Sequence, residues 1–460
     1  MEIIENVEVI DVGTDGIAIA KHNGMVVFLK YAVTGDIVDV KILKKKKNYV
    51  EGKIEKIHKA GETRTLPFCS HYGICGGCKW QHITYEGQLF YKQKQINDAF
   101  NRVARLSPKV VLPIIPSPAT IEYRNKMEYA FTNSSWLNDF NENKYTDKKP
   151  GLGFHIAGMF KQIINIQKCY LQNDFANKLR NTIRDIAVKE KMSFYNIKEH
   201  TGFLRNIIIR NTTINEWMLI VVFGYENIKL RESLLEKIKA EFPELNSLMY
   251  VINTKKNDTI SDLPVYLYSG YSYITEKMHN LKLKTGPVSF YQTNSLQAEN
   301  LYSVIKEFAS LSGKETVYDL YTGTGSIANF ISPNAYKIIG IDNIESAIAD
   351  ASENSKNNNI NNTIFYSGDL AKIFTSDFIN INGIPDVIIT DPPRSGMHPK
   401  VVEEILKIMP QKIVYVSCNP ATQARDIAML AKNYEIIKMQ AVDMFPHTSH
   451  IENVVLLIRN

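Results

Sequence analysis

The sequence lacks a long apolar run, and it has few cysteines, few tryptophans and little net charge. No stretch of about 18 consecutive apolar residues occurs. The acidic start, Glu2 to Glu5, lacks the basic and then apolar order of a signal peptide. We therefore expect a cytoplasmic protein without a membrane partner. The formal net charge of +6 is small for 460 residues, so composition alone does not indicate a nucleic-acid partner.

The cysteines are few and odd in number, which argues against a disulfide framework. Without a secretory signal, each thiol is better considered as a metal ligand, a nucleophile or a small core residue. The five are Cys69, Cys75, Cys78, Cys169 and Cys418.

The length predicts about three domains. In residues 1–60, short apolar strands alternate with glycine-containing turns, which is typical of a small β-barrel of the oligonucleotide-binding type. Strands and helical segments alternate in residues 61–275, which we expect to form an α+β domain. In residues 276–460 the alternation predicts an α/β fold, a doubly wound Rossmann-like sheet.

Lysines crowd the second half of the predicted barrel. Such crowding is typical of a surface that binds phosphates. A solvated, charged edge would explain it equally well. The lysines are Lys41, Lys44, Lys45, Lys46, Lys47, Lys53, Lys56 and Lys59.

Four predicted strands of the C-terminal domain are each followed directly by residues that could bind a ligand or take part in a reaction. In open α/β sheets, ligands bind beyond the carboxyl ends of the strands, so these motifs should converge on one crevice. The strands are residues 316–320, 337–341, 386–390 and 412–417, and a final strand covers 453–458.

The first motif predicts a nucleotide-binding loop. Asp319 to Ala328 contains Gly323 and Gly325 between a strand and a helix, where glycine lets the backbone approach a ligand closely. Asp342 follows the next strand and could accept hydrogen bonds from ribose hydroxyls. The same residues satisfy the dinucleotide fingerprint, so a nicotinamide-dependent oxidoreductase is an alternative. A turn that needs glycine only for its geometry is another.

Residues downstream favour a methyltransferase that uses S-adenosyl-L-methionine. Asp391-Pro392-Pro393-Arg394 follows a strand at the position where methyltransferases that act on nucleic acids bind the target base. The prolines make this turn rigid, and the Asp391 carboxylate can accept a hydrogen bond from a heterocycle's N–H. A dehydrogenase has no need of this turn. Taken alone, the triplet could also be an ordinary turn.

Cys418 and Glu452 are the catalytic candidates. Cys418 follows a buried strand, and a thiolate that adds to carbon 6 of uracil makes carbon 5 nucleophilic. A lone cysteine is otherwise often an inert core residue. Glu452 could remove the proton from carbon 5 if a closed site raises its pKa, with His450 as a weaker candidate. Otherwise Glu452 would be a surface carboxylate at the start of a strand.

Several motifs together resemble the bacterial RNA uracil-5 methyltransferase family, the RumA-like 23S rRNA enzymes. The resemblance is carried by residues 286–294, 319–325, 391–394, 417–422 and 447–452, and is dense from Gly286 to Asn460. It implies that Cys418 is the nucleophile and Glu452 the base. It further implies which residues line the pocket for the methyl donor and the target, with Asp391 nearest the target nucleobase. They are Gln292, Tyr321, Asp342, Asp369 and Asp391.

The remaining four cysteines predict a metal centre. The spacing of Cys69, Cys75 and Cys78, with Cys169 as the remaining candidate for a fourth ligand, suits zinc as well as an iron-sulfur cluster. Unrelated buried thiols are the alternative. The resemblance favours a 4Fe-4S cluster with a structural or RNA-positioning role.

The resemblance also extends to the predicted barrel, which is similar to the TRAM domain. Bacterial relatives that act on transfer RNA generally lack both barrel and cluster, so their presence points to 23S ribosomal RNA as the substrate. A tRNA uracil-5 methyltransferase is the first alternative. A non-catalytic RNA-binding iron-sulfur protein is the second. We expect a monomer with no obligate protein partner.

Overall fold

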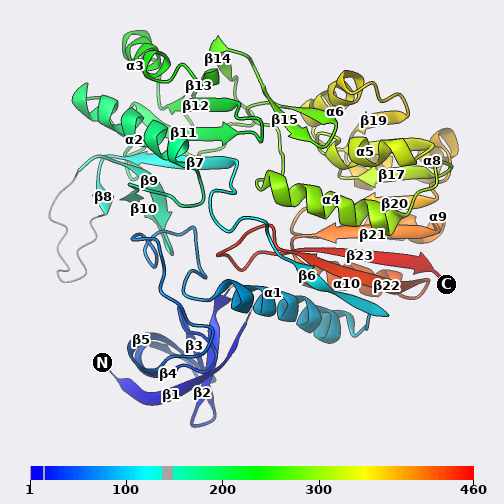
Figure 1. Cartoon of the computed structure of the whole chain (residues 1–460), viewed down its shortest axis with the longest axis horizontal. Helices are drawn as coiled ribbons and strands as arrows, with labels where there is room; N and C mark the ends of the chain where they lie inside the picture. The colour runs from blue at the N-terminus through cyan, green and yellow to red at the C-terminus, as the bar shows by residue number, and fades with distance from the viewer. Residues whose placement is uncertain (1, 14–15, 137–148) are drawn as a thin grey trace.

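The computed structural model describes residues 2–13, 16–136 and 149–460 (Figure 1). Residues 1 and 14–15 of the predicted barrel and 137–148 of the predicted central domain lie outside the described residues. The described residues form a closed barrel, an eight-stranded central sheet, a small two-stranded sheet and an eight-stranded C-terminal sheet. No helix in the described ranges is long and apolar enough to cross a bilayer.

The small barrel that the sequence predicts is confirmed, and it is closed by five strands in the order β1-β2-β3-β5-β4. Inward residues such as Val38 and Val40 alternate with outward ones, because successive side chains of a strand point to opposite faces. Trp80, fully buried, packs with this core and so joins the barrel to the next segment. The strands are β1 (Ile3–Val12), β2 (Ala18–His22), β3 (Met25–Leu29), β4 (Ile37–Lys45) and β5 (Tyr49–Lys59).

The central domain is an eight-stranded sheet in the order β14-β13-β12-β11-β7-β9-β10-β8. Two helices, α2 (Asp174–Lys189) and α3 (Ile228–Glu241), pack against its core. The strands are β7 (Lys126–Thr132), β8 (Ser135–Trp136), β9 (Gly151–Ile156), β10 (Met159–Asn165), β11 (Leu204–Asn211), β12 (Trp217–Phe223), β13 (Leu245–Ile252) and β14 (Tyr266–Gly270).

The C-terminal domain has an eight-stranded sheet in the order β19-β18-β17-β20-β21-β23-β22-β6. Neighbouring strands from β19 to β21 are parallel, and β23 runs antiparallel to β21. The strands are β17 (Thr316–Leu320), β18 (Lys337–Asp342), β19 (Thr363–Ser367), β20 (Val387–Thr390), β21 (Lys412–Ser417), β22 (Tyr434–Val442) and β23 (Glu452–Arg459).

Helices cover both faces of this sheet, as the predicted doubly wound fold requires. Ile388 of β20 packs into one core, with α9 and α10, whereas its neighbours Val387 and Ile389 pack into the other, with α4 and α5. The helices are α4 (Ser295–Ala309), α5 (Ser326–Ile331), the 3-10 turn η3 (Ser332–Asn334), α6 (Glu345–Asn357), α7 (Leu370–Ile373), α8 (Ser376–Asn382), α9 (Pro399–Ile408) and α10 (Pro420–Leu430).

Part of the segment 61–275 joins the C-terminal sheet. Strand β6 (Val110–Ile115) pairs in parallel with β22 at the sheet edge. Helix α1 (Tyr85–Ala99) lies beside α10 (Figure 1). Together with the π-turn η2 (Phe100–Ala104), it buries Ile96 and Phe100 in the same core as α10. These pairings involve residues more than 300 positions apart, so local patterns could not reveal them.

Candidate functional site

All seven residues predicted to form the catalytic and donor site line one cavity. It has a volume of about 1280 Å³ and lies at the carboxyl ends of β17, β18, β20 and β21. This is where a doubly wound sheet places its ligands. The seven are Gln292, Tyr321, Asp342, Asp369, Asp391, Cys418 and Glu452.

The glycine loop forms one wall of this cavity. Gly323 has a φ of +55°, and a side chain added there would meet no atom within 4 Å, so its backbone borders open space. Asp342 accepts a hydrogen bond from the Gly323 N–H at 2.9 Å and one from the Ile344 N–H at 3.0 Å. Its carboxylate is thereby held at the wall, with lone pairs left to accept hydroxyl groups of a ligand.

Gln292 is held in the cavity from the central domain. Its carbonyl accepts a 2.8 Å hydrogen bond from the side-chain amide of Asn125. Asn125 also donates to the hydroxyl of Ser295 at the start of α4. The segment that carries Gln292 is therefore fixed between the two domains, which the sequence motif alone did not indicate.

Strand pairing brings Cys418 and Glu452 together. Ser417, the last residue of β21, pairs with Asn453 of β23, so the next residue on one strand lies beside the preceding residue on the other. Cys418 follows β21 directly, and Glu452 begins β23. Glu452 is only 5% exposed, which excludes the alternative of a surface carboxylate.

Burial changes the protonation of the three acidic groups. Burial, together with the nearby charge of Asp319, raises the pKa of the Asp391 carboxyl to about 7. The pKa of Glu452 lies well above its usual value, because of burial first and Asp391 second. Burial also raises the pKa of the Cys418 thiol to about 11, with Glu452 and Asp391 adding to this effect. The Asp391 carboxyl can therefore exchange a proton near neutral pH.

Arg394 opposes the pKa shifts of Cys418 and Glu452, a role that its place in the proline turn did not reveal. It hydrogen-bonds Cys418 and lowers the pKa of that thiol, and its charge lowers the pKa of Glu452. Its backbone carbonyl accepts a 2.9 Å hydrogen bond from the Asn419 side chain. A cation between a thiol and a carboxyl stabilises the charged form of each. The residue type and the neighbouring Asp391 were the only signals in the sequence.

His450 lies outside the lining of this cavity. Its Nδ1 is 3.4 Å from Nη2 of Arg394. It therefore contacts the site through Arg394, whereas Glu452 borders the cavity directly. This placement favours Glu452 over His450 as the base.

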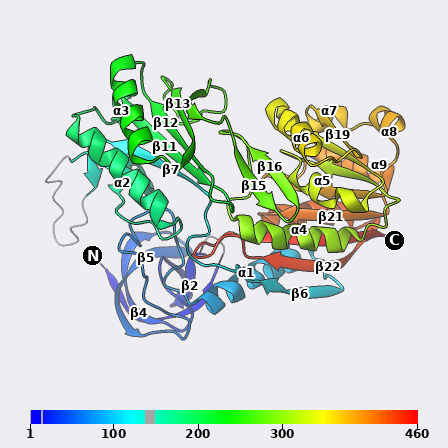
Figure 2. The ribbon, with the colours of Figure 1, turned by 45° about the horizontal axis from the view of Figure 1, so that its top comes forward.

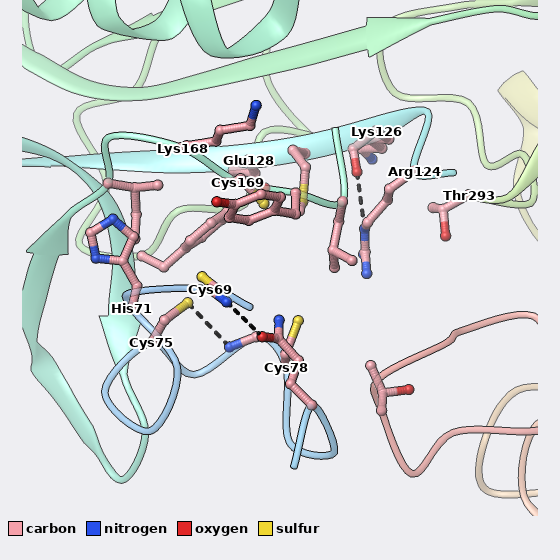
Figure 3. Close-up of a pocket in the computed structure, with 18 of the residues that line it drawn as sticks. Cys69, His71, Cys75, Cys78, Arg124, Lys126, Glu128, Lys168, Cys169 and Thr293 are labelled. Atoms are coloured by element: carbon pink, nitrogen blue, oxygen red, sulfur yellow. Dashed lines mark hydrogen bonds between the residues drawn. The ribbon is translucent and has the colours of Figure 1, made fainter. Parts of the chain in front are cut away.

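A second cavity collects the four remaining cysteines (Figure 3). It has a volume of about 410 Å³ and is lined by Cys69, Cys75, Cys78 and Cys169, all of which are free thiols. Burial raises the pKa of Cys75 and of Cys78 to about 12. Cys169 comes from the chain that follows β10, and the other three from one loop. The described residues contain no group of three or more His, Cys, Asp or Glu side chains arranged to hold a metal ion.

The cysteine loop contacts the segment that leads to Glu452. The His447 carbonyl accepts hydrogen bonds from the N–H groups of Lys79 at 2.9 Å and Trp80 at 3.0 Å. Thr448 lines the cysteine cavity itself. The two cavities are thus built around one shared segment, residues 445–452.

Comparison with family descriptions identifies two parts of the chain. Residues 271–460 match the description tRNA (Uracil-5-)-methyltransferase, and residues 4–54 match the TRAM domain. The second match coincides with the closed barrel. The first contains the glycine loop, Cys418 and Glu452.

Similar proteins cover nearly the whole chain. A protein of Bacteroides thetaiotaomicron described as an uncharacterized RNA methyltransferase is 49% identical to this chain, over 96% of this chain and 99% of that protein. A protein of Porphyromonas gingivalis with the same description is 47% identical, over 98% of this chain and 99% of that protein. The crystal structure of Pyrococcus abyssi tRNA (uracil-54, C5)-methyltransferase in complex with S-adenosyl-L-homocysteine is also similar. It has a TM-score of 0.77, is 28% identical and covers 98% of this chain and 100% of its own.

Proposed function

Since this chain belongs to the family of S-adenosylmethionine-dependent RNA uracil-5 methyltransferases, we propose that it forms 5-methyluridine in 23S ribosomal RNA. The observation that carries this proposal is the pairing of β21 with β23, which puts the Cys418 thiol and the Glu452 carboxyl side by side at the cavity wall. A nucleophile and a base in one crevice are what methylation at carbon 5 of uracil requires.

The donor site fits S-adenosyl-L-methionine, which would supply an electrophilic methyl group. The cavity is large enough for this ligand together with a nucleobase, since ordinary ligand pockets measure roughly 300–1,000 Å³. We propose that Asp342 binds the ribose hydroxyls and that Gly323 allows close approach of the ligand. Gln292, Tyr321 and Asp369 would complete the lining.

In the proposed reaction, the Cys418 thiolate forms a bond to carbon 6 of the uracil, and the ring becomes nucleophilic at carbon 5. After carbon 5 has gained the methyl group, Glu452 takes the proton from that carbon. The electron pair of the broken C–H bond restores the ring double bond and expels the thiolate. Asp391 would hold the uracil through a ring N–H, and Arg394 would stabilise the thiolate.

RNA binding is supported by the barrel. The lysines of β4 and β5 and of the turn between them are mostly exposed, and only some are paired, as Lys44 is with Glu51. Exposed lysines at this density bind phosphates, and the release of counterions from the nucleic acid favours this binding. We propose that this surface holds structured RNA while the target uridine is flipped into the crevice.

Transfer RNA is the second candidate substrate. The choice of 23S rRNA depends on the expectation that tRNA enzymes generally lack the barrel and the cysteines. The Pyrococcus abyssi enzyme, whose name specifies tRNA, nevertheless aligns with 98% of this chain. An alignment over nearly the whole chain is therefore not restricted to ribosomal enzymes, and both RNAs need to be tested.

We propose that the second cavity holds a 4Fe-4S cluster on Cys69, Cys75, Cys78 and Cys169. Four thiols around one cavity match the ligand set of such clusters. Zinc needs four sulfurs at about 2.3 Å from one point. The preference for the cluster over a single zinc ion rests on the resemblance of the cysteine spacing to the ribosomal-RNA members of the family. The cluster would support the loop that contacts residues 445–452.

We also propose that the protein acts in the cytoplasm as a single chain. The donor loop, the nucleophile and the base all come from one chain, so no second copy is needed to complete the site. Residues 1–60, 61–275 and 276–460 would serve as the RNA-binding, central and catalytic domains. Helix α1 and strand β6 would tie the central segment to the catalytic sheet.

The direct test is to incubate the protein with labelled S-adenosyl-L-methionine and, separately, 23S rRNA and tRNA. We expect labelled 5-methyluridine in 23S rRNA with the wild type and none with Cys418→Ala. If 5-methyluridine forms only in tRNA, the proposed substrate is transfer RNA and not 23S rRNA. Undiminished product with Cys418→Ala would refute the covalent mechanism.

A further inference from the structure

A small hairpin at the mouth of the crevice has an outer face that the proposed mechanism does not use. Strands β15 (Ile274–Met278) and β16 (Leu281–Thr285) form a separate two-stranded sheet. It lies between the central sheet and the catalytic sheet (Figure 2). Lys284 and the following Gly286 both line the large cavity, so the hairpin borders its entrance.

The inner and outer faces of the hairpin differ sharply in character. Ile274, Met278 and Leu283 are buried and pack into the two neighbouring cores. The alternate positions face outward, because side chains of a strand alternate between its faces. These outward residues are Tyr273 next to β15, Thr275 and Lys277 of β15, and Lys282 and Lys284 of β16.

Two of the outward lysines oppose each other. Lys277 and Lys282 are directly paired across the two strands, and both are exposed. Like charges in this position destabilise a hairpin. Among the described residues, neither ammonium has a carboxylate within ion-pairing distance, whereas Lys284 pairs with Glu353 at 2.6 Å. An anionic partner on this face would relieve the repulsion.

The third lysine and an aromatic ring continue this face towards the crevice. Nζ of Lys284 lies 5.0 Å from the centre of the Tyr273 ring, which is 37% exposed. Lys282 is two residues, or about 7 Å along the strand, from Lys284 at the entrance. Cations beside an exposed aromatic ring are typical of grooves that follow a single-stranded nucleic acid.

We propose that the outward face of the β15–β16 hairpin binds the phosphates of the RNA strand next to the target uridine. This proposal rests on the proposed function, because it places the strand by the base that enters the crevice. Lys277 and Lys282 would each neutralise one phosphate. The hairpin would thus guide the strand from the solvent to the crevice, separately from the barrel.

The test uses the full chain and the variant Lys277→Gln/Lys282→Gln. Loss of two single-strand phosphate contacts should lower the slope of log K against log salt by about 1.4, and it should raise the KM for RNA about tenfold near physiological salt. The kcat and the KM for S-adenosyl-L-methionine should not change. Thermal stability should stay the same or rise, because the opposed charges are gone.

The matched control is Lys229→Gln/Lys239→Gln. These two lysines are exposed on α3, which contributes no residue to the crevice, and their loss changes the net charge equally. The control should keep the wild-type KM and salt slope.

Equal losses in the two double variants, or a wild-type KM and slope for the hairpin variant, would overturn the proposal for the hairpin. If the wild type methylates neither RNA, the proposed function itself fails. If the wild type methylates RNA and the hairpin variant keeps the wild-type KM and salt slope, the proposed function stands and only the role of the hairpin in RNA binding is refuted.

Discussion

Lys92 of α1 and Asp443 form an ion pair that is completely buried, with Nζ 2.5 Å from Oδ1. Lys92 also donates to the carbonyl of Phe445 at 3.0 Å. The pair fixes the start of the segment 443–452, which ends at Glu452. Helix α1 therefore holds the segment that leads to Glu452 in place, although it lies more than 300 positions earlier in the sequence.

Removing one partner of this pair should destabilise the fold. Lys92→Met leaves the Asp443 carboxylate buried without its cation, so we expect the free energy of unfolding to fall by about 3–5 kcal/mol. Urea denaturation measures this loss. Lys94→Met is the control on the same helix, since its pairs with Asp11 and Asp98 are partly exposed, and it should cost at most about 1 kcal/mol. Equal losses in the two variants would contradict the importance of the buried pair.

Glu452→Gln should trap the reaction at the covalent stage. The glutamine cannot take the proton from carbon 5, so the bond from Cys418 to the ring should persist after methyl transfer. We expect an RNA–protein adduct that survives denaturing electrophoresis and turnover reduced at least about a hundredfold. The double variant Glu452→Gln/Cys418→Ala should form no adduct. Normal turnover by Glu452→Gln would remove this residue from the base role.

Arg394 should set the pH range of activity. Its charge lowers the pKa of Cys418 and of Glu452, so Arg394→Met should raise both pKa values. Less thiolate and less carboxylate are then present at a given pH, and the rise of kcat/KM with pH should move to higher pH. Near neutral pH we expect a loss of roughly tenfold.

Arg394→Lys keeps a cation near both groups and should recover part of the neutral-pH activity. Profiles of kcat/KM against pH for the three proteins check this order. A profile for Arg394→Met that coincides with that of the wild type would exclude an electrostatic role for this residue.

The cysteines should separate into two functional groups. If the proposed cluster is present, Cys75→Ser should lose protein-bound iron and visible absorption after anaerobic purification, because one of the four proposed ligands is gone. Cys418→Ala is the matched control, and it should keep full iron while losing methylation. Metal analysis together with absorption spectroscopy measures both. A colourless wild-type protein that contains one zinc ion would refute the iron-sulfur cluster and show a zinc site instead.

Much of the site is determined by the sequence alone, because strand ends can be read locally. The apolar strands that precede Asp391 and Cys418 have an obvious pattern, and parallel strands bring their carboxyl ends to one edge. The glycine loop and Asp342 follow the same rule. The alternating strands of residues 7–58 likewise predict the barrel, since all five of its strands follow one another within residues 3–59.

Only the tertiary structure decides how these parts meet. The register of β21 with β23 puts Glu452 beside Cys418, and burial there produces the raised pKa values. Lys92 reaches Asp443 across 351 positions, and the outward lysines of the hairpin become a surface only when its other face is buried. The physical reason is that such contacts depend on packing between distant segments, whereas a strand or a turn depends on a few consecutive residues.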